Sequence, residues 1–279
     1  MKHAFVVTAE DDGLRLDQVI AKRVLAMSRR KARAVIDAGG VFVDRARTKV
    51  ASRPVKPGQA IEVNLGSESR AQSLAPIVVF SDEHLIIADK PAGLVTAPTP
   101  ESDRGDLLDQ LKTEFGEVLL VHRIDLPTSG LLVFARTRDA NKILGDAFAA
   151  HRIDREYRAV AVGEVAAQTI DRPIEGRRAV THVEPLEQLD GATLLVARLE
   201  TGRTHQIRIH LAGLGHPLAG DPQHGGELSR TFTPKAPRLA LHAAVLGFVH
   251  PATGAPVRFE SPLPAELNAW ITRLRTSTP

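Results

Sequence analysis

One aspartate stands out in the sequence because basic side chains flank it in a short segment between two apolar runs. Residues 122–130 are His-Arg-Ile-Asp-Leu-Pro-Thr-Ser-Gly, with Asp125 as the only carboxylate. The apolar runs 118–121 and 131–135 predict two β-strands, and the segment between them then forms the connecting loop. Asp, Pro, Ser and Gly are also what an ordinary turn requires, so the segment alone favours a structural turn over an active site.

Several other kinds of catalytic chemistry find no support in the sequence. Ser129 lacks the Gly-x-Ser-x-Gly elbow of serine hydrolases, and neither a P-loop nor a Gly-x-Gly-x-x-Gly motif is present. His205 and His210 are five residues apart with no Glu between them, which is a weak pattern for zinc, and the absence of cysteine excludes thiolate chemistry. One carboxylate, several arginines and the only tyrosine, Tyr157, remain. This set suits a reaction in which a single Asp acts without metal.

The charge of the chain is distributed unevenly along the sequence. Residues 13–56 contain twelve Lys and Arg against three Asp and Glu, a net charge of +9. Because the 279 residues together carry only +3, the remainder carries −6. Such an asymmetry indicates a basic module that binds a polyanion, attached to a body that is not basic.

The basic module has the pattern of two helices followed by short strands. Apolar spacing predicts a first helix over residues 16–26, and Ser28 is a good N-cap for a second helix that ends at Gly39. Residues 41–43 and 60–63 are predicted strands. Cations at a helix N-terminus oppose the helix dipole, and each lowers helix stability by about 0.3–1 kcal/mol. A phosphate bound there would be attracted both by the helix dipole and by the cations. The second helix nevertheless begins with a run of cations, Arg29, Arg30 and Lys31, with Arg33 following.

This segment resembles the S4 RNA-binding domain in residues 15–17, 28–32, 36–39, 41–44 and 55–59. The resemblance implies that the module binds structured RNA through its shape and through phosphate contacts. Its RNA-binding residues would be the cations of the second helix, Arg29, Arg30, Lys31 and Arg33.

The rest of the chain alternates predicted strands with single helices. Strands are expected at 77–80, 85–88 and 155–163, and helices at 107–115, at 137–150, after an N-cap at Thr204, and near Trp270. This order predicts an α+β protein, in which a small αβ domain is followed by a mixed, mostly antiparallel sheet. The expected division is a first domain over 1–66, a linker over 67–76 and a second domain over 77–279.

The second domain closely resembles the RluA family of pseudouridine synthases. The matching segments are 89–94, 122–125 with 128–132, 155–159, 201–210, 220–221 and 239–243, in family order across about 200 residues. Agreement of several motifs in order is very improbable by chance. The resemblance therefore overturns the interpretation of Asp125 as a mere turn residue and implies that the chain isomerises uridines in structured RNA, without cofactor or metal.

The resemblance also assigns roles to individual residues. Asp125 would be the catalytic carboxylate, which either attacks C1′ of the uridine or removes its C2′ proton, and both routes remain open. Either route requires an ionised carboxylate, which a nearby cation favours, and by family position that cation is Arg208. Tyr157 would stack on the uracil, and Arg123 would fill the place of the flipped nucleotide. The other substrate-binding residues would be Leu241 with the neighbouring Leu239, His122, Arg203 and His205.

The sequence departs from the family pattern at positions that leave the RNA substrate open between ribosomal and transfer RNA. The loop at 174–176 is almost absent, Val183 replaces an aromatic residue, Asp89 stands where Asn is common, and His224 follows Gln223 where an apolar–Tyr pair is usual. A non-catalytic RNA-binding protein or chaperone on the same scaffold is the alternative. No apolar run reaches 18 residues and no signal peptide is recognisable, so a cytoplasmic protein, expected to be a monomer without membrane contact, is predicted.

Overall fold

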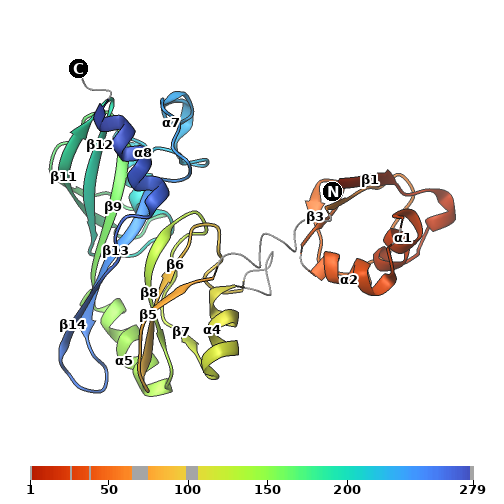
Figure 1. Cartoon of the computed structure of the whole chain (residues 1–279), viewed down its shortest axis with the longest axis horizontal. Coiled ribbons are helices and arrows are strands. Elements are labelled where there is room, and N and C mark those ends of the chain that lie inside the picture. The colour runs from red at the N-terminus through yellow and green to blue at the C-terminus, as the bar shows by residue number, and fades with distance from the viewer. Residues whose placement is uncertain (1, 26, 38, 65–74, 99–105, 277–279) are drawn as a thin grey trace. The chain divides into compact units, whose positions relative to one another are not determined.

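A computed structural model describes residues 2–25, 27–37, 39–64, 75–98 and 106–276 (Figure 1). The chain divides into two compact units, Met1–Ala75 with Ala97–Gln110, and Pro76–Thr96 with Leu111–Pro279. Residues 67–74 of the predicted linker lie outside the described residues.

The first unit contains an antiparallel sheet of order β1-β4-β2-β3 and two α-helices. Its elements are β1 (Lys2–Val6), η1 (Ala9–Asp11), α1 (Leu16–Arg23), α2 (Arg29–Asp37), β2 (Val41–Val43), β3 (Ala46–Arg47) and β4 (Ala60–Asn64). The predicted extension of the first helix to residue 26 is wrong, because Val24 already has extended backbone angles. The hydroxyl of Ser28 accepts a hydrogen bond from the backbone N–H of Lys31 at 3.2 Å, as expected of an N-cap.

The second unit is built on one ten-stranded sheet of order β10-β11-β12-β9-β13-β8-β6-β5, with β14 paired to β13 and β7 paired to β8. The strands are β5 (Ile77–Ser81), β6 (Leu85–Lys90), β7 (Leu119–Leu120), β8 (Ser129–Ala135), β9 (Asp154–Val162), β10 (Gln168–Asp171), β11 (Val180–Leu189), β12 (Ala192–Leu199), β13 (Leu241–Val249) and β14 (Pro256–Glu260). Every named pair in this sheet is antiparallel except β13 with β8, which is parallel. The predicted mixed, mostly antiparallel α+β fold is therefore confirmed.

The described residues from 106 to 276 contain five helices: α4 (Leu107–Phe115), α5 (Arg138–Ala149), α6 (Gln206–Gly213), α7 (Gly226–Thr231) and α8 (Ala265–Thr276). Helix α5 begins as predicted after Thr137, whose hydroxyl accepts the N–H of Ala140 at 3.2 Å. The predicted N-cap at Thr204 is wrong, since His205 precedes α6 and has left-handed backbone angles. Within the described residues, no helix has the length and apolar character needed to span a membrane.

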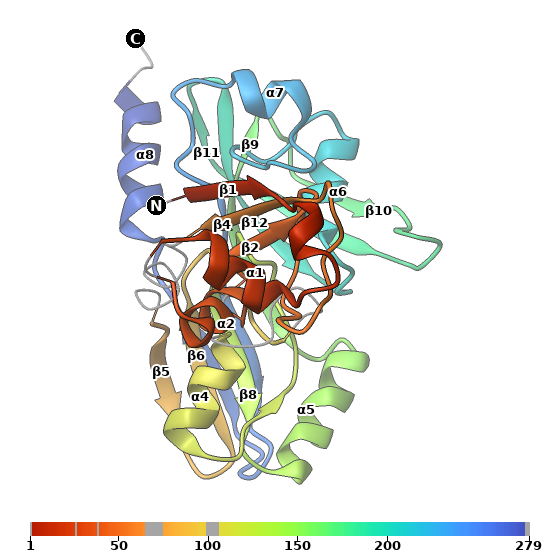
Figure 2. The same ribbon diagram turned by 90° about the vertical axis from the view of Figure 1, so that its right-hand side faces the viewer.

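The sheet is covered on both faces, and this fixes where its side chains point. Helix α5 contacts β7 and β8, whereas α8 contacts β11 (Figure 2). Arg155 of β9 lies over the ring of Phe148 in α5, with 5.5 Å between the guanidinium carbon and the ring centroid. Val160 of the same strand packs in the core cluster of Trp270 in α8. Because side chains alternate along a strand, Tyr157 shares the α5 face with Arg155.

Candidate active site

The loop that carries Asp125 is held by hydrogen bonds to three consecutive backbone carbonyls. The carbonyl of Ile124 accepts from the Thr96 hydroxyl at 3.0 Å, and that of Asp125 accepts from the Thr128 N–H at 3.0 Å. The carbonyl of Leu126 accepts from the N–H of Gly93 at 2.8 Å. Three fixed peptide units in a row leave the Asp125 backbone little freedom, so its carboxylate is presented in one position.

A buried lysine reinforces the same loop from β6. The side chain of Lys90 is fully buried, and its Nζ donates to the carbonyls of Leu94 at 2.8 Å, Pro91 at 3.1 Å and Leu126 at 3.4 Å. Burial lowers the pKa of Lys90 to about 7, although the negative charge of Asp125 opposes this shift. Lys90 thus supports the loop and places a titratable cation close to its carboxylate.

Asp125, Arg208 and Asp221 form a row of ion pairs, the charge chain, whose outer end is the carboxylate of Asp125. Its Oδ2 accepts from Nη1 of Arg208 at 3.0 Å. The other two nitrogens of Arg208 both bind Asp221, Nε to Oδ2 and Nη2 to Oδ1, each at 2.8 Å. The side chains of Arg208 and Asp221 are 3% and 1% exposed, while that of Asp125 is 23% exposed. Asp221 therefore anchors the arginine, and only the outer carboxylate faces the solvent.

The charge chain keeps both of its inner groups ionised. Burial alone would raise the pKa of Asp221, but hydrogen bonds from Arg208 and from the N–H groups of His224 and Gln223 lower it to about 2. Burial opposes the charge on Arg208, yet its bonds to Asp221 and Asp125 raise its pKa above the ordinary value. The cation beside Asp125 is therefore permanent.

Tyr157 and Leu241 come from neighbouring strands and lie on the same face of the sheet. Tyr157 belongs to β9, and Leu241 of β13 pairs with Ala159, two residues further along β9. Both side chains are buried, with residue exposures of 9% and 4%. Burial raises the pKa of Tyr157, Arg155 opposes this shift, and Asp125 adds to it. The phenol therefore stays protonated at neutral pH.

His122 is bound to the scaffold through its ring. Its Nε2 accepts the backbone N–H of Val133 at 3.1 Å, and its ring stacks on Phe148 with 4.5 Å between centroids. Burial and the nearby Arg155 lower its pKa to about 3, so the ring is neutral. A part in substrate binding stays a prediction for His122, whose observed contacts are with β8 and α5.

The other predicted substrate-binding residues lie in two places. Arg123 is exposed beside Asp125. Arg203 is half-buried, and its Nε donates to the carbonyl of Arg178 at 3.1 Å. His205 places its Nε2 3.8 Å from Oδ2 of Asp125. Of the predicted catalytic set, the structure brings Asp125 and Arg208 into direct contact and places Tyr157 near enough for Asp125 to affect its pKa.

The close approach of strands β8 and β13 at Gly130 fixes the end of the Asp125 loop. Gly130 has φ +116° and pairs with Ala243 in the parallel β8–β13 ladder. A Cβ at position 130 would lie 2.3 Å from the carbonyl oxygen of Ala243, so only glycine fits. The preceding Ser129 accepts a hydrogen bond from Nη2 of Arg238 at 2.8 Å and contacts Nδ1 of His242 at 2.9 Å. Strand β13 thereby fixes the position at which the Asp125 loop enters the sheet.

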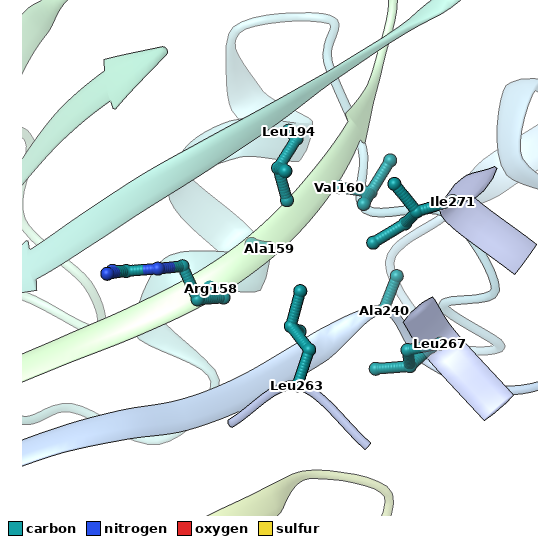
Figure 3. Close-up of a pocket in the computed structure, with 8 residues that line it drawn as sticks. All are labelled: Arg158, Ala159, Val160, Leu194, Ala240, Leu263, Leu267 and Ile271. Carbon is teal, nitrogen blue, oxygen red and sulfur yellow. The ribbon is translucent and has the colours of Figure 1, made fainter. Parts of the chain in front are cut away.

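An apolar hollow too narrow to hold a water molecule lies elsewhere, on the α8 face of the sheet (Figure 3). Its lining is apolar apart from Arg158, and consists of Arg158, Ala159, Val160, Leu194, Ala240, Leu263, Leu267 and Ile271. Val160 pairs with Leu194 across β9 and β12, so both point away from the face that holds Tyr157. Since no set of polar groups converges on it, the hollow is a packing gap under α8.

Two of the predicted RNA-binding cations of α2, together with Arg15, contact one buried carboxylate. Arg29 and Arg33 contact Oδ2 of Asp17 at 3.5 and 2.7 Å, and Arg15 contacts Oδ1 at 3.0 Å. Asp17 itself is completely buried. Burial raises its pKa, but the hydrogen bonds from Arg15 and Arg33 lower it to about 2. The three arginines remain 41–52% exposed, so Asp17 orients their guanidinium groups without removing them from solvent.

Sequence reasoning missed three residues that build the site. Lys90 and Asp221 were noted only as parts of motifs, and His224 only as a departure from a pattern. No sequence signal indicates that Lys90 is buried, because lysine is among the residues least often found inside. Asp221 follows Gly220, which has φ +71° and marks a tight turn.

Within the described ranges, no group of three or more His, Asp or Glu could hold a metal ion.

Two family models match the chain. The model described as RNA pseudouridylate synthase matches residues 84–213, and the S4 domain model matches residues 14–61. The first range contains Asp125, Tyr157 and Arg208, and the second contains the cations of α2.

Relatives with curated names match over almost the whole chain. "Ribosomal large subunit pseudouridine synthase D" of Nitrosomonas europaea is 37% identical, over 94% of this chain and 85% of that protein. The protein of the same name from Escherichia coli (strain K12) is 34% identical, over 94% of this chain and 91% of its own. Among solved structures, "Human RNA Pseudouridylate Synthase Domain Containing 4" has a TM-score of 0.60 at 23% identity, covering 74% of this chain and 96% of that chain. This last likeness concerns the fold alone.

Proposed function

Because the chain belongs to the RNA pseudouridylate synthase family and carries an S4 domain, we propose that it converts uridines of large-subunit ribosomal RNA to pseudouridine. The choice of ribosomal over transfer RNA is supported by the names of the relatives that match most of the chain. In the proposed division, residues 1–66 bind the RNA and residues 77–279 perform the isomerisation, joined by the linker 67–76.

One observation carries the chemical part of the proposal. Arg208 binds Asp125 through Oδ2, and within the described ranges Oδ1 makes no hydrogen bond or ion pair. A carboxylate with one oxygen neutralised by a buried cation and the other free is suited to act on a sugar carbon or its proton. The sugar of the target uridine would meet Oδ1, which would either attack C1′ or take the C2′ proton.

The surrounding residues would handle the base and its neighbours. Tyr157 would stack on the uracil while the base detaches, rotates and rejoins through C5, and Leu241, on the same face of the sheet, would also contact the base. Arg123 is exposed and free to fill the place of the flipped nucleotide. His205 would contact the substrate beside Asp125, and Arg203 and His122 would be further substrate-binding residues.

The assembly and location of the protein follow from the same proposal. Asp125, Tyr157 and Arg208 all come from one chain, which supports a monomer as the active form. Action on ribosomal RNA favours a cytoplasmic location.

The direct test is to incubate the purified protein with unmodified transcripts of large-subunit ribosomal RNA and of transfer RNA. We expect pseudouridine at a few discrete positions in the ribosomal transcript and none in the transfer RNA, as mapped by carbodiimide modification and primer extension. Modification of the transfer RNA alone would overturn the proposed substrate. RNA binding without any isomerisation would favour the non-catalytic alternative.

The Asp17→Asn variant tests whether RNA binding depends on the fixed orientation of the arginines or only on the net positive charge of the basic unit. The change makes the basic unit more positive, so charge alone would tighten binding. If Asp17 orients Arg29 and Arg33 for phosphates, the loss of order in two side chains, at about 0.5–1.5 kcal/mol each, should weaken binding about tenfold. Filter binding at several salt concentrations measures this effect.

Arg30→Ala is the matched control for this comparison. Arg30 is exposed and shares the first turn of α2 with Arg29. Its removal should lower the slope of log affinity against log salt by about one, as expected for a lost phosphate contact. Tighter binding by Asp17→Asn, with circular dichroism unchanged, would contradict the orienting role of Asp17.

A further inference from the structure

His205 has a backbone conformation that residues other than glycine rarely adopt. Its φ of 55° and ψ of 23° lie in the left-handed region, immediately before helix α6, which carries Arg208. Non-glycine residues in this region cluster at sites where the strain serves a purpose. Here the conformation accompanies a ring whose Nε2 lies 3.8 Å from Oδ2 of Asp125. The His205 ring therefore lies beside the same carboxylate oxygen that Arg208 binds.

The other nitrogen of the His205 ring is held by a second histidine. Nδ1 of His205 lies 2.9 Å from Nε2 of His224, and the rings meet edge to face with centroids 5.0 Å apart. The backbone N–H of His224 donates to Oδ1 of Asp221 at 3.0 Å. Asp221 thus positions both neighbours of Asp125, Arg208 directly and His205 through His224.

The charges around the pair decide which ring donates the hydrogen bond. Burial and then Arg208 lower the pKa of His224, against Asp221 and Asp125, so His224 is neutral at neutral pH. If His205 donated from Nδ1, a neutral ring would turn the lone pair of Nε2 toward the Asp125 carboxylate. If His224 donates, the Nε2–H of His205 faces that carboxylate, which is the electrostatically favoured arrangement.

We propose that His224 is a positioning residue that holds His205 in the tautomer whose Nε2–H faces Asp125. The inference rests on the proposed uridine isomerisation by Asp125. Arg208 and the Nε2–H of His205 then both face Oδ2 of Asp125, which leaves Oδ1 as the oxygen that contacts the uridine sugar. His224 itself touches neither the carboxylate nor the substrate and acts only through His205.

Two substitutions at position 224 separate this role from packing. His224→Phe keeps an aromatic ring but removes both nitrogens, whereas the side-chain amide nitrogen of His224→Gln can donate from nearly the place of the imidazole Nε2. In single-turnover tritium release from ribosomal RNA that contains 5-tritiated uridine, we expect His224→Phe to be about tenfold slower, a change of about 1.4 kcal/mol in barrier. His224→Gln should recover the wild-type rate to within about threefold, and RNA affinity should be unchanged in both.

The comparison of the two variants gives a readout that packing would not change. His224→Gln restores a hydrogen-bond donor without an aromatic ring, whereas His224→Phe keeps the ring without a donor, so loss of the hydrogen bond slows only His224→Phe. Should His224→Phe be unstable, His224→Met removes the nitrogens with a smaller side chain and is tested in the same way.

The outcomes that overturn the inference differ from those that overturn the proposed function. Full activity of His224→Phe or a deficit that His224→Gln shares would exclude the positioning role. Absence of tritium release from the wild-type protein would instead contradict the proposed isomerisation.

Discussion

Asp125→Asn is expected to abolish tritium release from RNA that contains 5-tritiated uridine, by at least about 10³-fold, as when an essential catalytic group is lost. The amide has the shape of the carboxylate and its oxygen can still accept from Arg208, so the loop and the charge chain should persist. An amide cannot take up the C2′ proton at neutral pH, and it is a poor nucleophile toward C1′. The variant therefore removes the chemistry proposed for Oδ1 and little else.

The measurement combines single-turnover tritium release with a binding assay on the same RNA. RNA affinity should stay within about twofold of wild type, because the proposed phosphate contacts are made mainly by the cations of α2 and not by Asp125. Asp146→Asn, an exposed aspartate on α5, is the control for the loss of one negative charge. Tritium release by Asp125→Asn at the wild-type rate would rule out Asp125 as the catalytic group.

Asp221→Asn should damage both stability and catalysis, although Asp221 has no predicted contact with the substrate. The carboxylate accepts two bonds from Arg208 and one each from the N–H groups of Gln223 and His224. An amide would turn its NH₂ group toward at least one of these donors and leave a buried charge partly unpaired. Breaking a buried pair in this way costs about 3–5 kcal/mol of unfolding free energy. The rate of tritium release should fall about 100-fold as Arg208 loses its fixed position.

The stability part of this prediction has a defined pH dependence. The pKa of Asp221 is about 2 in the folded protein, against an ordinary value of 3.8. A lowered carboxyl pKa stabilises the fold above the unfolded-state pKa, here by about 2–3 kcal/mol, and this contribution is lost as the pH falls through about 4 toward 2. The difference in unfolding free energy between wild type and variant, from urea denaturation, should be constant from pH 8 to 5 and smaller at pH 3. Equal stability at pH 7 would show that Asp221 does not anchor Arg208.

The sequence predicted those parts of the fold that depend on local signals. Helix α4 has the predicted bounds, and each end of α5 (Arg138–Ala149) lies one residue inside the predicted range 137–150. Both carry strong helical spacing and ordinary end residues, so their structure needs little from the rest of the chain. The predicted strand over residues 118–121 shortens to Leu119–Leu120, because pairing with β8, which no local pattern encodes, sets its ends.

The details of the site that the sequence did not reveal depend on contacts between distant segments. His205 replaces Thr204 as the cap of α6, and its left-handed backbone is unusual for histidine. Lys90 is buried because carbonyls of two loops surround its Nζ, and one of them, at Leu126, is 36 residues away. His224 belongs to the site because its backbone N–H donates to Asp221 and its ring contacts the ring of His205. Family resemblance indicated which residues to examine, but only the fold shows which of them touch.

The place of β13 in the sheet has a consequence for the order of folding. This strand (Leu241–Val249) lies between β9 and β8, and in the sheet order it joins the half that contains β10, β11, β12 and β9 to the half that contains β8, β6 and β5 (Figure 1). Asp125 belongs to the second half, and Tyr157 to the first. During synthesis, which proceeds at roughly 5–20 residues per second, the two halves can acquire structure before β13 emerges. We therefore expect that a nascent chain shorter than about 250 residues has no catalytic activity, and that activity appears only once β13 has joined the two halves.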